Sequence, residues 1–293
     1  MIETWKKTEL EKLIRAHGFR CTRSLGQNFL VDRNTLEKVV RGAELSADDH
    51  VIEPGAGAGA LTVLLAQAAG RVTAVEIDGR LIPLLREATE GLPNVDIIHG
   101  DFLKRHGDGS SAPASFKLVG NLPYYITTPI IASLFEPGEG GVRPKPPALA
   151  VFMVQKEVAE RLISPPCKKA YGAITVLVQY HADVELLSTV SREVFTPRPN
   201  VDSAIIRLRP KDLSGDDAET ASIMFRLVRA GFDMRRKTLR NSLAAAGFSP
   251  NDMASAFERT GIDPIRRAET LSPRDFYTLA SALKDKKWQL MRL

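Results

Sequence analysis

The chain has 293 residues, of which 44% are hydrophobic and 26% are charged, and its formal net charge is +5. This balance is typical of globular proteins, so it excludes disordered and fibrous classes, and the length predicts one large domain or two smaller ones. No apolar run reaches the roughly 18 residues that a membrane-spanning helix needs, and the charged start lacks the apolar core of a secretory signal, so we expect a cytoplasmic protein without a membrane partner.

The N-terminal segment is predicted to be helical and basic. Apolar residues at helical spacing favour a helix over 3–17, and the following loop over 18–31 carries Arg23 and no acidic residue. Asp32 has the position of an N-cap for a helix over 34–42. We take these elements, up to residue 48, as the first part of the larger domain.

Short apolar strands and helices then alternate along the chain. Strands are expected at 50–53, 71–77, 95–99, 117–120, 148–155, 182–187 and 203–208, and helices at 60–69, 81–88, 129–135 and 171–180. Strands that alternate with helices over this length are typical of a parallel sheet with helices on both faces. The sequence therefore predicts an α/β class with a doubly wound, Rossmann-like sheet. Two segments rich in Gly, Pro or Ser, 104–116 and 136–147, are expected to be surface loops.

The last part of the chain has a different pattern. Residues 211–219 are polar and form the best candidate for a linker. Helical periodicity follows, and the expected helices are 221–230, 236–246, 251–260 and 273–283. We therefore predict two domains, an α/β domain over 1–210 and a small helical domain over 211–293.

Charge and cysteine usage limit the partners. The net charge is +3 over 1–30, −2 over 31–210 and +4 over 211–293. Basic ends around a near-neutral body suggest a polyanion such as a nucleic acid, although an ordinary solvated helix surface gives the same count. Cys21 and Cys167 have no second Cys or His at ligand spacing, so we expect reduced thiols and no metal.

A glycine-rich turn follows the first strand of the predicted sheet. Gly55, Gly57 and Gly59 allow a tight turn and a close backbone approach to a ligand, and a helix N-terminus comes next. Glu76 ends the next strand, where an acid can accept both ribose hydroxyls of an adenosine cofactor. The third glycine favours S-adenosylmethionine (SAM), whereas the pattern from Gly55 to Ala60 also satisfies the looser dinucleotide motif. A tight turn without any ligand is the remaining alternative.

Asp101 ends the third predicted strand. At this place a carboxylate can reach the amino group of adenine, or it can cap the next helix, and the residues alone leave both roles open.

The sequence Asn121-Leu122-Pro123-Tyr124 ends the fourth strand and suggests the chemistry. The exocyclic amine of adenine is a poor nucleophile, because its lone pair is delocalised into the ring. Acceptors on both of its hydrogens free that lone pair, and the Asn121 side-chain oxygen and the Leu122 carbonyl can supply them. Pro123 stiffens the turn, and Tyr124 can stack on the base. A proline turn with a buried aromatic pair is the alternative.

With these features in this order, the sequence resembles the ribosomal RNA adenine dimethyltransferase family, and within it the bacterial small-subunit branch. The resemblance runs from about residue 18 to residue 283. The segments that carry it are 25–30, 53–62, 121–124, 195–203, 235–243 and 267–272.

The resemblance implies the cofactor, the site and the substrate. Cofactor contacts carry over to Asn28, Leu30, Gly55, Glu76, Asp101 and Asn121, beside the candidate Gly57 from the turn. Handling of the target base carries over to 121–124, with Phe195 packed near a flipped base. The substrate would be two adjacent adenosines in the hairpin loop near the 3′ end of small-subunit (16S) rRNA, and the enzyme would have a role in small-subunit biogenesis.

Basic residues are the candidates for RNA binding. They are Arg23, Arg235, Arg236, Lys237 and Arg240. A helix over 236–246 would bring Arg236, Lys237 and Arg240 to one face, which suits a phosphate backbone, although a solvated face is the alternative. The family has a more basic, aromatic stretch where this chain has 23–25, with one charge and no aromatic residue.

Three other functions compete with small-subunit dimethylation. The same chemistry on large-subunit rRNA is one, and the helical C-terminal segment 235–243 argues against it. A ribosome-assembly factor whose methylation is secondary is another. An NAD oxidoreductase leaves 121–124 and the basic ends unexplained. We expect a monomer, because the sequence shows no obvious exposed apolar stripe.

Overall fold

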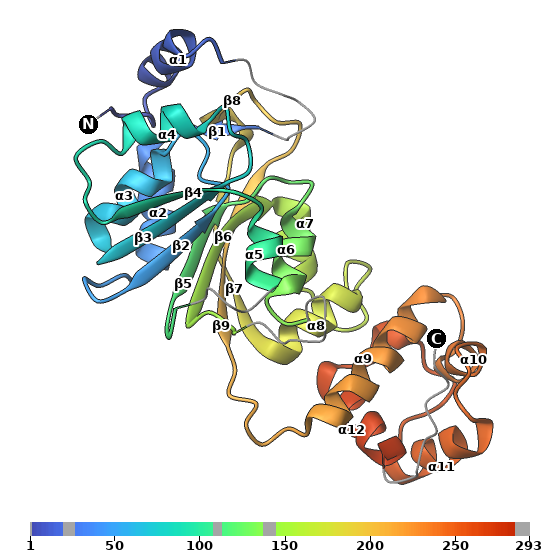
Figure 1. Ribbon diagram of the computed structural model, residues 1–293. Coiled ribbons are helices and arrows are strands. Elements are labelled where there is room, and N and C mark those ends of the chain that lie inside the picture. Colours follow the sequence, from blue (N-terminus) through green and yellow to red (C-terminus); the bar gives the residue numbers. More distant parts are fainter. Residues whose placement is uncertain (1, 20–26, 108–112, 137–144, 285–293) are drawn as a thin grey trace. The chain divides into compact units, whose positions relative to one another are not determined.

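The computed structural model describes residues 2–19, 27–107, 113–136 and 145–284 (Figure 1). The chain divides into two compact units, the first comprising Met1–Ala159 with Asp183–Pro210 and the second Glu160–Ala182 with Lys211–Leu293. The sequence predicted a single boundary after residue 210. The difference is the segment 160–182, which packs with the later helices because Tyr171 and Val176 are buried in their core.

A seven-stranded sheet forms the centre of the first unit. Its strands are β2 (His50–Pro54), β3 (Arg71–Glu76), β4 (Val95–His99), β5 (Lys117–Asn121), β6 (Leu149–Gln155), β7 (Ala182–Val190) and β9 (Ser203–Pro210). The order is β4-β3-β2-β5-β6-β9-β7, with the first five strands parallel and β9 antiparallel to β6. Every residue of β6 except Gln155 is buried, as a central strand covered on both faces requires. The predicted α/β class is confirmed.

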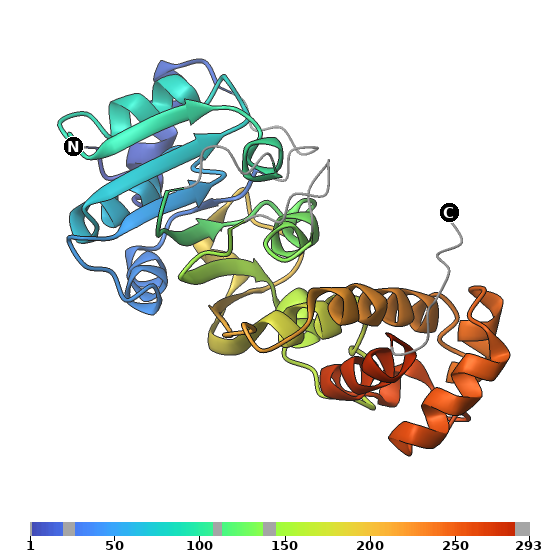
Figure 2. The same cartoon turned by 60° about the horizontal axis from the view of Figure 1, so that its bottom comes forward.

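Helices cover both faces of this sheet (Figures 1 and 2). The helices of this unit are α1 (Lys7–Ala16), α2 (Arg33–Gly42), α3 (Ala60–Ala68), α4 (Ile82–Ala88), α5 (Phe102–Gly107), α6 (Thr127–Ser133) and the start of α7 (Lys156–Leu162), which crosses the unit boundary after Ala159. Asp32 caps α2 as predicted, since its side chain accepts the backbone N–H of Thr35. Helices α5 and α7 were not predicted, because they are only six and seven residues long and have too few turns to show a period.

The strand order reverses between β2 and β5. From β2 the chain adds β3 and then β4 on one side, and it returns to place β5 on the other side of β2. At such a reversal the loops after the two strands diverge and leave a crevice at the carboxyl ends. Gly55 directly follows β2, and Asn121 is the last residue of β5. The fold therefore brings two predicted site segments, 66 positions apart, to the same edge of the sheet.

A second, two-stranded sheet lies at this unit's N-terminal loop. Strand β1 (Phe29–Leu30) pairs antiparallel with β8 (Phe195–Thr196), with Leu30 opposite Phe195. Two residues on each side give no sequence periodicity, so this pairing was not predicted. It fixes residues 29 and 30 against a segment far away in the chain.

The second unit is helical. Its helices are α8 (Ala173–His181), α9 (Ala218–Asp233), α10 (Leu239–Ala245), α11 (Pro250–Thr260) and α12 (Pro273–Lys284). They enclose one core that includes Met224, Leu243, Phe257 and Phe276. Among the helices that the structure describes, none is long and apolar enough to cross a membrane.

Candidate functional site

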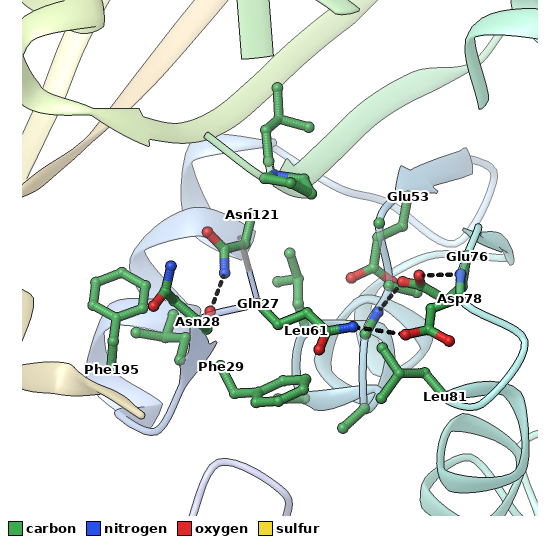
Figure 3. Close-up of a pocket in the computed structure, with 18 of the residues that line it drawn as sticks. Gln27, Asn28, Phe29, Glu53, Leu61, Glu76, Asp78, Leu81, Asn121 and Phe195 are labelled. Carbon is green, nitrogen blue, oxygen red and sulfur yellow. Dashed lines mark hydrogen bonds between the residues drawn. The ribbon is translucent and has the colours of Figure 1, made fainter. Parts of the chain in front are cut away.

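A pocket opens at the carboxyl edge of the sheet, where β2 and β5 end (Figure 3). Its empty space is about 920 Å³, a value that includes the part open to solvent. The walls come from segments that range along the chain from Thr4 to Phe195. A ligand in this pocket would therefore contact several distant parts of the first unit at once.

The glycine turn forms one wall of the pocket. Gly55, Gly57 and Gly59 have φ angles of +74°, +60° and +84°, which side-chain-bearing residues rarely adopt. A Cβ atom on Gly55 would lie 3.2 Å from Cδ of Pro123, in the turn that follows β5. The two turns thus approach each other closely, and the backbone of the first remains accessible to a ligand.

Glu76 closes the wall beside the glycine turn. Its Oε2 accepts the backbone N–H of Gly57 and its Oε1 accepts that of Asp78, each over 2.8 Å (Figure 3). Burial raises the pKa of this carboxyl, whereas the backbone donors act in the opposite direction. A carboxylate oxygen has two lone-pair directions, so both oxygens retain a position for a hydroxyl of a ligand.

Two further acids line the pocket and were missed by sequence reasoning. Glu53 is 2% exposed, and its Oε2 accepts the hydroxyl of Thr62 over 2.6 Å. Burial is the main reason why the pKa of Glu53 rises to about 8, and the neighbouring Glu76 adds to it. Oδ2 of Asp78 accepts a hydrogen bond from Nε2 of Gln27 over 2.8 Å. The signal was available, since Glu53 and Asp78 each lie two residues from a predicted site residue.

In contrast to Glu53, Asp78 is kept ionised by a neighbouring arginine. The guanidinium of Arg80 bonds both carboxylate oxygens of Asp78, at 2.9 and 2.6 Å, and lowers its pKa to about 2. The pocket therefore combines a neutral carboxyl at Glu53 with an ionised one at Asp78 near neutral pH.

Asn121 points into the pocket from the end of β5 (Figure 3). Its Nδ2 lies 3.5 Å from the carbonyl oxygen of Asn28, at the outer limit of a hydrogen bond. This contact turns the amide nitrogen toward Asn28, so the side-chain oxygen is the atom that can face a ligand. An oxygen at this place can accept a hydrogen bond from a ligand.

The residues after Asn121 are held by the surrounding backbone. Leu122 donates its N–H to the carbonyl of Met153 in β6, and the Pro123 carbonyl accepts the N–H of Ile126, each over 3.1 Å. The hydroxyl of Tyr124 lies 2.8 Å from Oγ of Ser203 in β9. These contacts fix the turn, and all three residues 122–124 line the pocket.

Most of the other predicted cofactor residues, and the predicted base contact Phe195, also reach the pocket. Asn28, Leu30 and Phe195 line it, and the pairing of β1 with β8 holds the last two together. Asp101 is not among the lining residues. Its Oδ1 accepts the backbone N–H of Leu103 over 2.9 Å, which is a cap of the short helix α5. Of the two roles that the sequence left open for Asp101, this contact fits the cap.

The predicted basic helix face does not exist as expected. Arg236 and Lys237 lie in the turn between α9 and α10, because Thr238 caps α10 and has an extended backbone. The prediction that both share a helix face with Arg240 is therefore wrong, although all three side chains are exposed.

The side chain of Arg235 is held by hydrogen bonds within the helical unit. Its Nη2 donates to the carbonyls of Lys169 and Tyr171 and to the carboxylate of Glu269, at 3.2, 3.1 and 2.9 Å. Arg23 lies outside the described residues. Among the residues that the structure does describe, no group of three or more His, Cys, Asp or Glu side chains could hold a metal ion.

Comparisons with known proteins agree with this geometry. The family model described as "Ribosomal RNA adenine dimethylase" matches residues 18–285. The chain is 43% identical over 276 residues to "Ribosomal RNA small subunit methyltransferase A" of Clostridium botulinum strain Loch Maree, covering 94% of this chain and 98% of that protein. It is 41% identical over 297 residues to the protein of the same name from Pelotomaculum thermopropionicum, covering 97% and 99%.

Two solved structures are similar over most of the chain. A dimethyladenosine transferase from Plasmodium falciparum has a TM-score of 0.71 at 27% identity, covering 86% of this chain and 95% of that one. The 23S rRNA methyltransferase ErmE has a TM-score of 0.66 at 29% identity, covering 87% and 99%.

Proposed function

Because the chain belongs to the ribosomal RNA adenine dimethylase family, we propose that it methylates two adjacent adenosines in the 3′-terminal hairpin loop of 16S rRNA, with SAM as the donor. Each adenosine becomes N6,N6-dimethyladenosine. The observation that carries the proposal is the side chain of Asn121 at the switch point of the sheet, in one pocket with the glycine turn and Glu76. The names of the curated relatives support the small subunit as the target.

The residues of the pocket fit the donor. Glu76 offers two carboxylate oxygens for the ribose hydroxyls, and the left-handed glycines Gly55 and Gly57 expose their backbone to the ligand. Asp78 stays ionised because Arg80 is paired with it, so this pair adds little net charge to the pocket. When bound, SAM supplies an electrophilic methyl group on a positively charged sulfur.

The protein's part in the reaction is to position the adenine amine. In the first transfer Asn121 accepts one hydrogen of N6 through its side-chain oxygen, and the carbonyl of Leu122 accepts the other. In the second transfer N6 carries a single hydrogen, which one of these two acceptors holds. This draws the nitrogen lone pair out of the ring and toward the methyl group. N6 gains the methyl carbon and releases one proton, while the electron pair of the broken bond stays on sulfur. Rate enhancement then comes from orientation and electrostatics.

The target base has to leave its stack to reach this pocket. A looped adenosine is the least costly to extrude, because it has lost most of its pairing already. Tyr124 and Phe195 line the pocket, and we assign to them the aromatic contacts with the extruded base. The hydroxyl contact of Tyr124 with Ser203 fixes the orientation of its ring.

The helical unit supplies a basic surface for the rRNA backbone. The surface consists of exposed basic side chains from two segments, Arg236, Lys237 and Arg240 in the first and Arg267 in the second. Backbone hydrogen bonds connect the first segment to the loop before Arg267. The N–H groups of residues 239 and 240 donate to the carbonyls of residues 266 and 264 at 2.6 and 3.1 Å. Cations gathered from two segments suit a phosphate backbone. We further propose a monomer that works in the cytoplasm.

The test uses labelled SAM, the purified protein, and small and large ribosomal subunits from cells that lack the dimethylation. We expect label in the small subunit only, with two methyl groups on each of two adjacent adenosines near the 3′ end by primer extension. Label confined to the large subunit would contradict the proposed target. The structural likeness to a 23S rRNA methyltransferase makes that control necessary. Tight small-subunit binding without any label would indicate an assembly factor instead.

A further inference from the structure

A polar side chain from the N-terminal segment is buried in the wall of the pocket. Thr4 is 0% exposed and lines the same pocket as Glu76 and Asn121. Its Oγ1 has no hydrogen-bond partner among the residues that the structure describes. A buried hydroxyl without a partner costs roughly 1–3 kcal/mol, so folded proteins rarely leave one without a function.

Packing holds Thr4 in this place. The next residue, Trp5, is buried in one core cluster with Leu36 and Val39 of α2, and the guanidinium of Arg33 lies 5.6 Å from the centre of its ring. The backbone N–H of Thr4 donates to the carbonyl of Ile2 over 3.0 Å. These contacts therefore fix the backbone of this residue before any ligand arrives.

Helix α1 extends the same wall. Leu10 is 1% exposed and lines the pocket, and Leu13 packs with Leu81 and Leu84 around α4. At the end of the helix, Nε2 of His17 lies 2.7 Å from a carboxylate oxygen of Glu87. The N-terminal segment is thus a fixed part of the pocket. The family model begins to match at residue 18, so this part lies outside the matched region.

The charges of the pocket indicate which ligand group the hydroxyl serves. The lining residues include three acids, of which Glu53 is neutral and Asp78 is paired with Arg80, and no Lys, Arg or His among those that the structure describes. The amino-acid end of SAM carries an ammonium and a carboxylate. The ammonium finds acceptors readily here, whereas the carboxylate depends on neutral donors such as hydroxyls, amides and backbone N–H groups. A pre-positioned hydroxyl is such a donor.

We propose that Thr4 is a further donor-binding residue, whose hydroxyl hydrogen-bonds the carboxylate at the amino-acid end of SAM. This rests on the proposed use of SAM. It assigns to the N-terminal segment a part in recognising the donor. It also gives a role to a buried hydroxyl that has no partner among the described residues.

The test measures how two different substitutions of Thr4 change the affinity for three ligands. Thr4→Val keeps the branched shape and removes the hydroxyl, and Thr4→Ser keeps the hydroxyl. Thr8→Val, on the exposed face of α1, is the matched control. Calorimetry measures the affinity for SAM, for S-adenosylhomocysteine, and for 5′-methylthioadenosine, which lacks the amino-acid end.

We expect Thr4→Val to weaken binding of SAM and S-adenosylhomocysteine about tenfold or more and to leave 5′-methylthioadenosine unchanged, because the hydrogen bond to a charged group is removed. Thr4→Ser and Thr8→Val should bind all three ligands nearly as the unchanged protein does. The melting temperature of the ligand-free protein should stay the same or rise in Thr4→Val, since a methyl group replaces an unsatisfied hydroxyl.

Two results would overturn the inference while the proposed function stands. One is an unchanged affinity of Thr4→Val for SAM, and the other is an equal loss for SAM and 5′-methylthioadenosine together with a lower melting temperature. If the unchanged protein binds none of the three ligands, the proposed use of SAM itself fails.

Discussion

The carboxylate of Glu76 accepts the backbone N–H of Gly57 over 2.8 Å and thereby joins the end of β3 to the turn after β2. The second oxygen accepts the N–H of Asp78 over the same distance. These bonds fix the carboxylate before the donor binds, so little conformational entropy is lost on binding. The glycine turn and the acid therefore act as one preformed binding unit.

Glu76→Ala should weaken SAM binding by roughly ten- to a hundredfold, since hydrogen bonds to a charged group contribute about 1.5–3 kcal/mol. Calorimetry with the purified protein measures this. Glu90→Gln, at an exposed position after α4, is the matched control and should bind normally. Unchanged affinity in Glu76→Ala would remove the ribose contact from the proposal.

Asn121→Ala should bind SAM nearly as well as the unchanged protein and lose most of its methyl transfer, by about a hundredfold or more, because the acceptor on the adenine amine is missing. Single-turnover assays on unmethylated small subunits separate the two effects. Asn251→Ala, exposed on α11, serves as the control. Near-normal turnover of Asn121→Ala would contradict the acceptor role. If the inactive variant still binds immature small subunits and supports their maturation, a binding role exists apart from catalysis.

Glu53 predicts a pH dependence of stability. Its pKa in the folded protein is about 8, above the ordinary value of 4.5 in the unfolded chain. Between these values the folded protein holds a proton that the unfolded chain releases, so the folded state loses stability as the pH rises. Below 4.5 the carboxyl is protonated in both states, and above 8 it is ionised in both.

The comparison with Glu53→Gln tests this, because the amide resembles the protonated acid and does not ionise. We expect the stability of Glu53→Gln relative to the unchanged protein to increase from about pH 5 to about pH 8 and to level off above that. Urea unfolding at a series of pH values measures the difference. A difference that does not change with pH would show that Glu53 is ionised in the folded protein.

The basic residues 235–237 should separate into two kinds. Arg236→Glu together with Lys237→Glu should weaken rRNA binding and lower the slope of log affinity against log salt, by roughly one for each phosphate that the protein no longer neutralises. The melting temperature should change little, because both side chains are exposed. An unaltered salt slope would mean that this turn does not face the RNA.

Arg235→Ala should behave differently. It removes the bonds from its Nη2 to the carbonyls of Lys169 and Tyr171 and to Glu269, so we expect a loss of stability of about 1–3 kcal/mol. Thermal unfolding measures it. A variant with unchanged stability and weaker RNA binding would assign Arg235 to the RNA surface.

The sequence predicted the parts of the site that follow strand ends. Gly55, Gly57, Glu76 and Asn121 are adjacent to strongly apolar strands, and the rule that parallel strands end at one edge was enough to bring them together. All four line the pocket. For these residues the local sequence was enough to predict both the backbone conformation and the position at the edge of the sheet.

The rest of the pocket depends on packing between distant segments. Thr4 reaches the wall through the burial of Trp5, and Phe195 through a two-residue strand pair with Leu30. Neither contact leaves a periodic trace in the sequence. The prediction of a helix from residue 236 failed for a local reason. Thr238 is the N-cap of α10, and threonine is favoured at N-caps, so the helix begins after it.

The helical unit is assembled from two separate stretches, because the chain enters it at Glu160, leaves after Ala182 and returns at Lys211. A single cut after residue 210 would separate the segment 160–182, with its buried Tyr171 and Val176, from the helices that cover it. Exchange of this unit between related enzymes therefore requires two coordinated transplants, and a chimaera with one junction should aggregate.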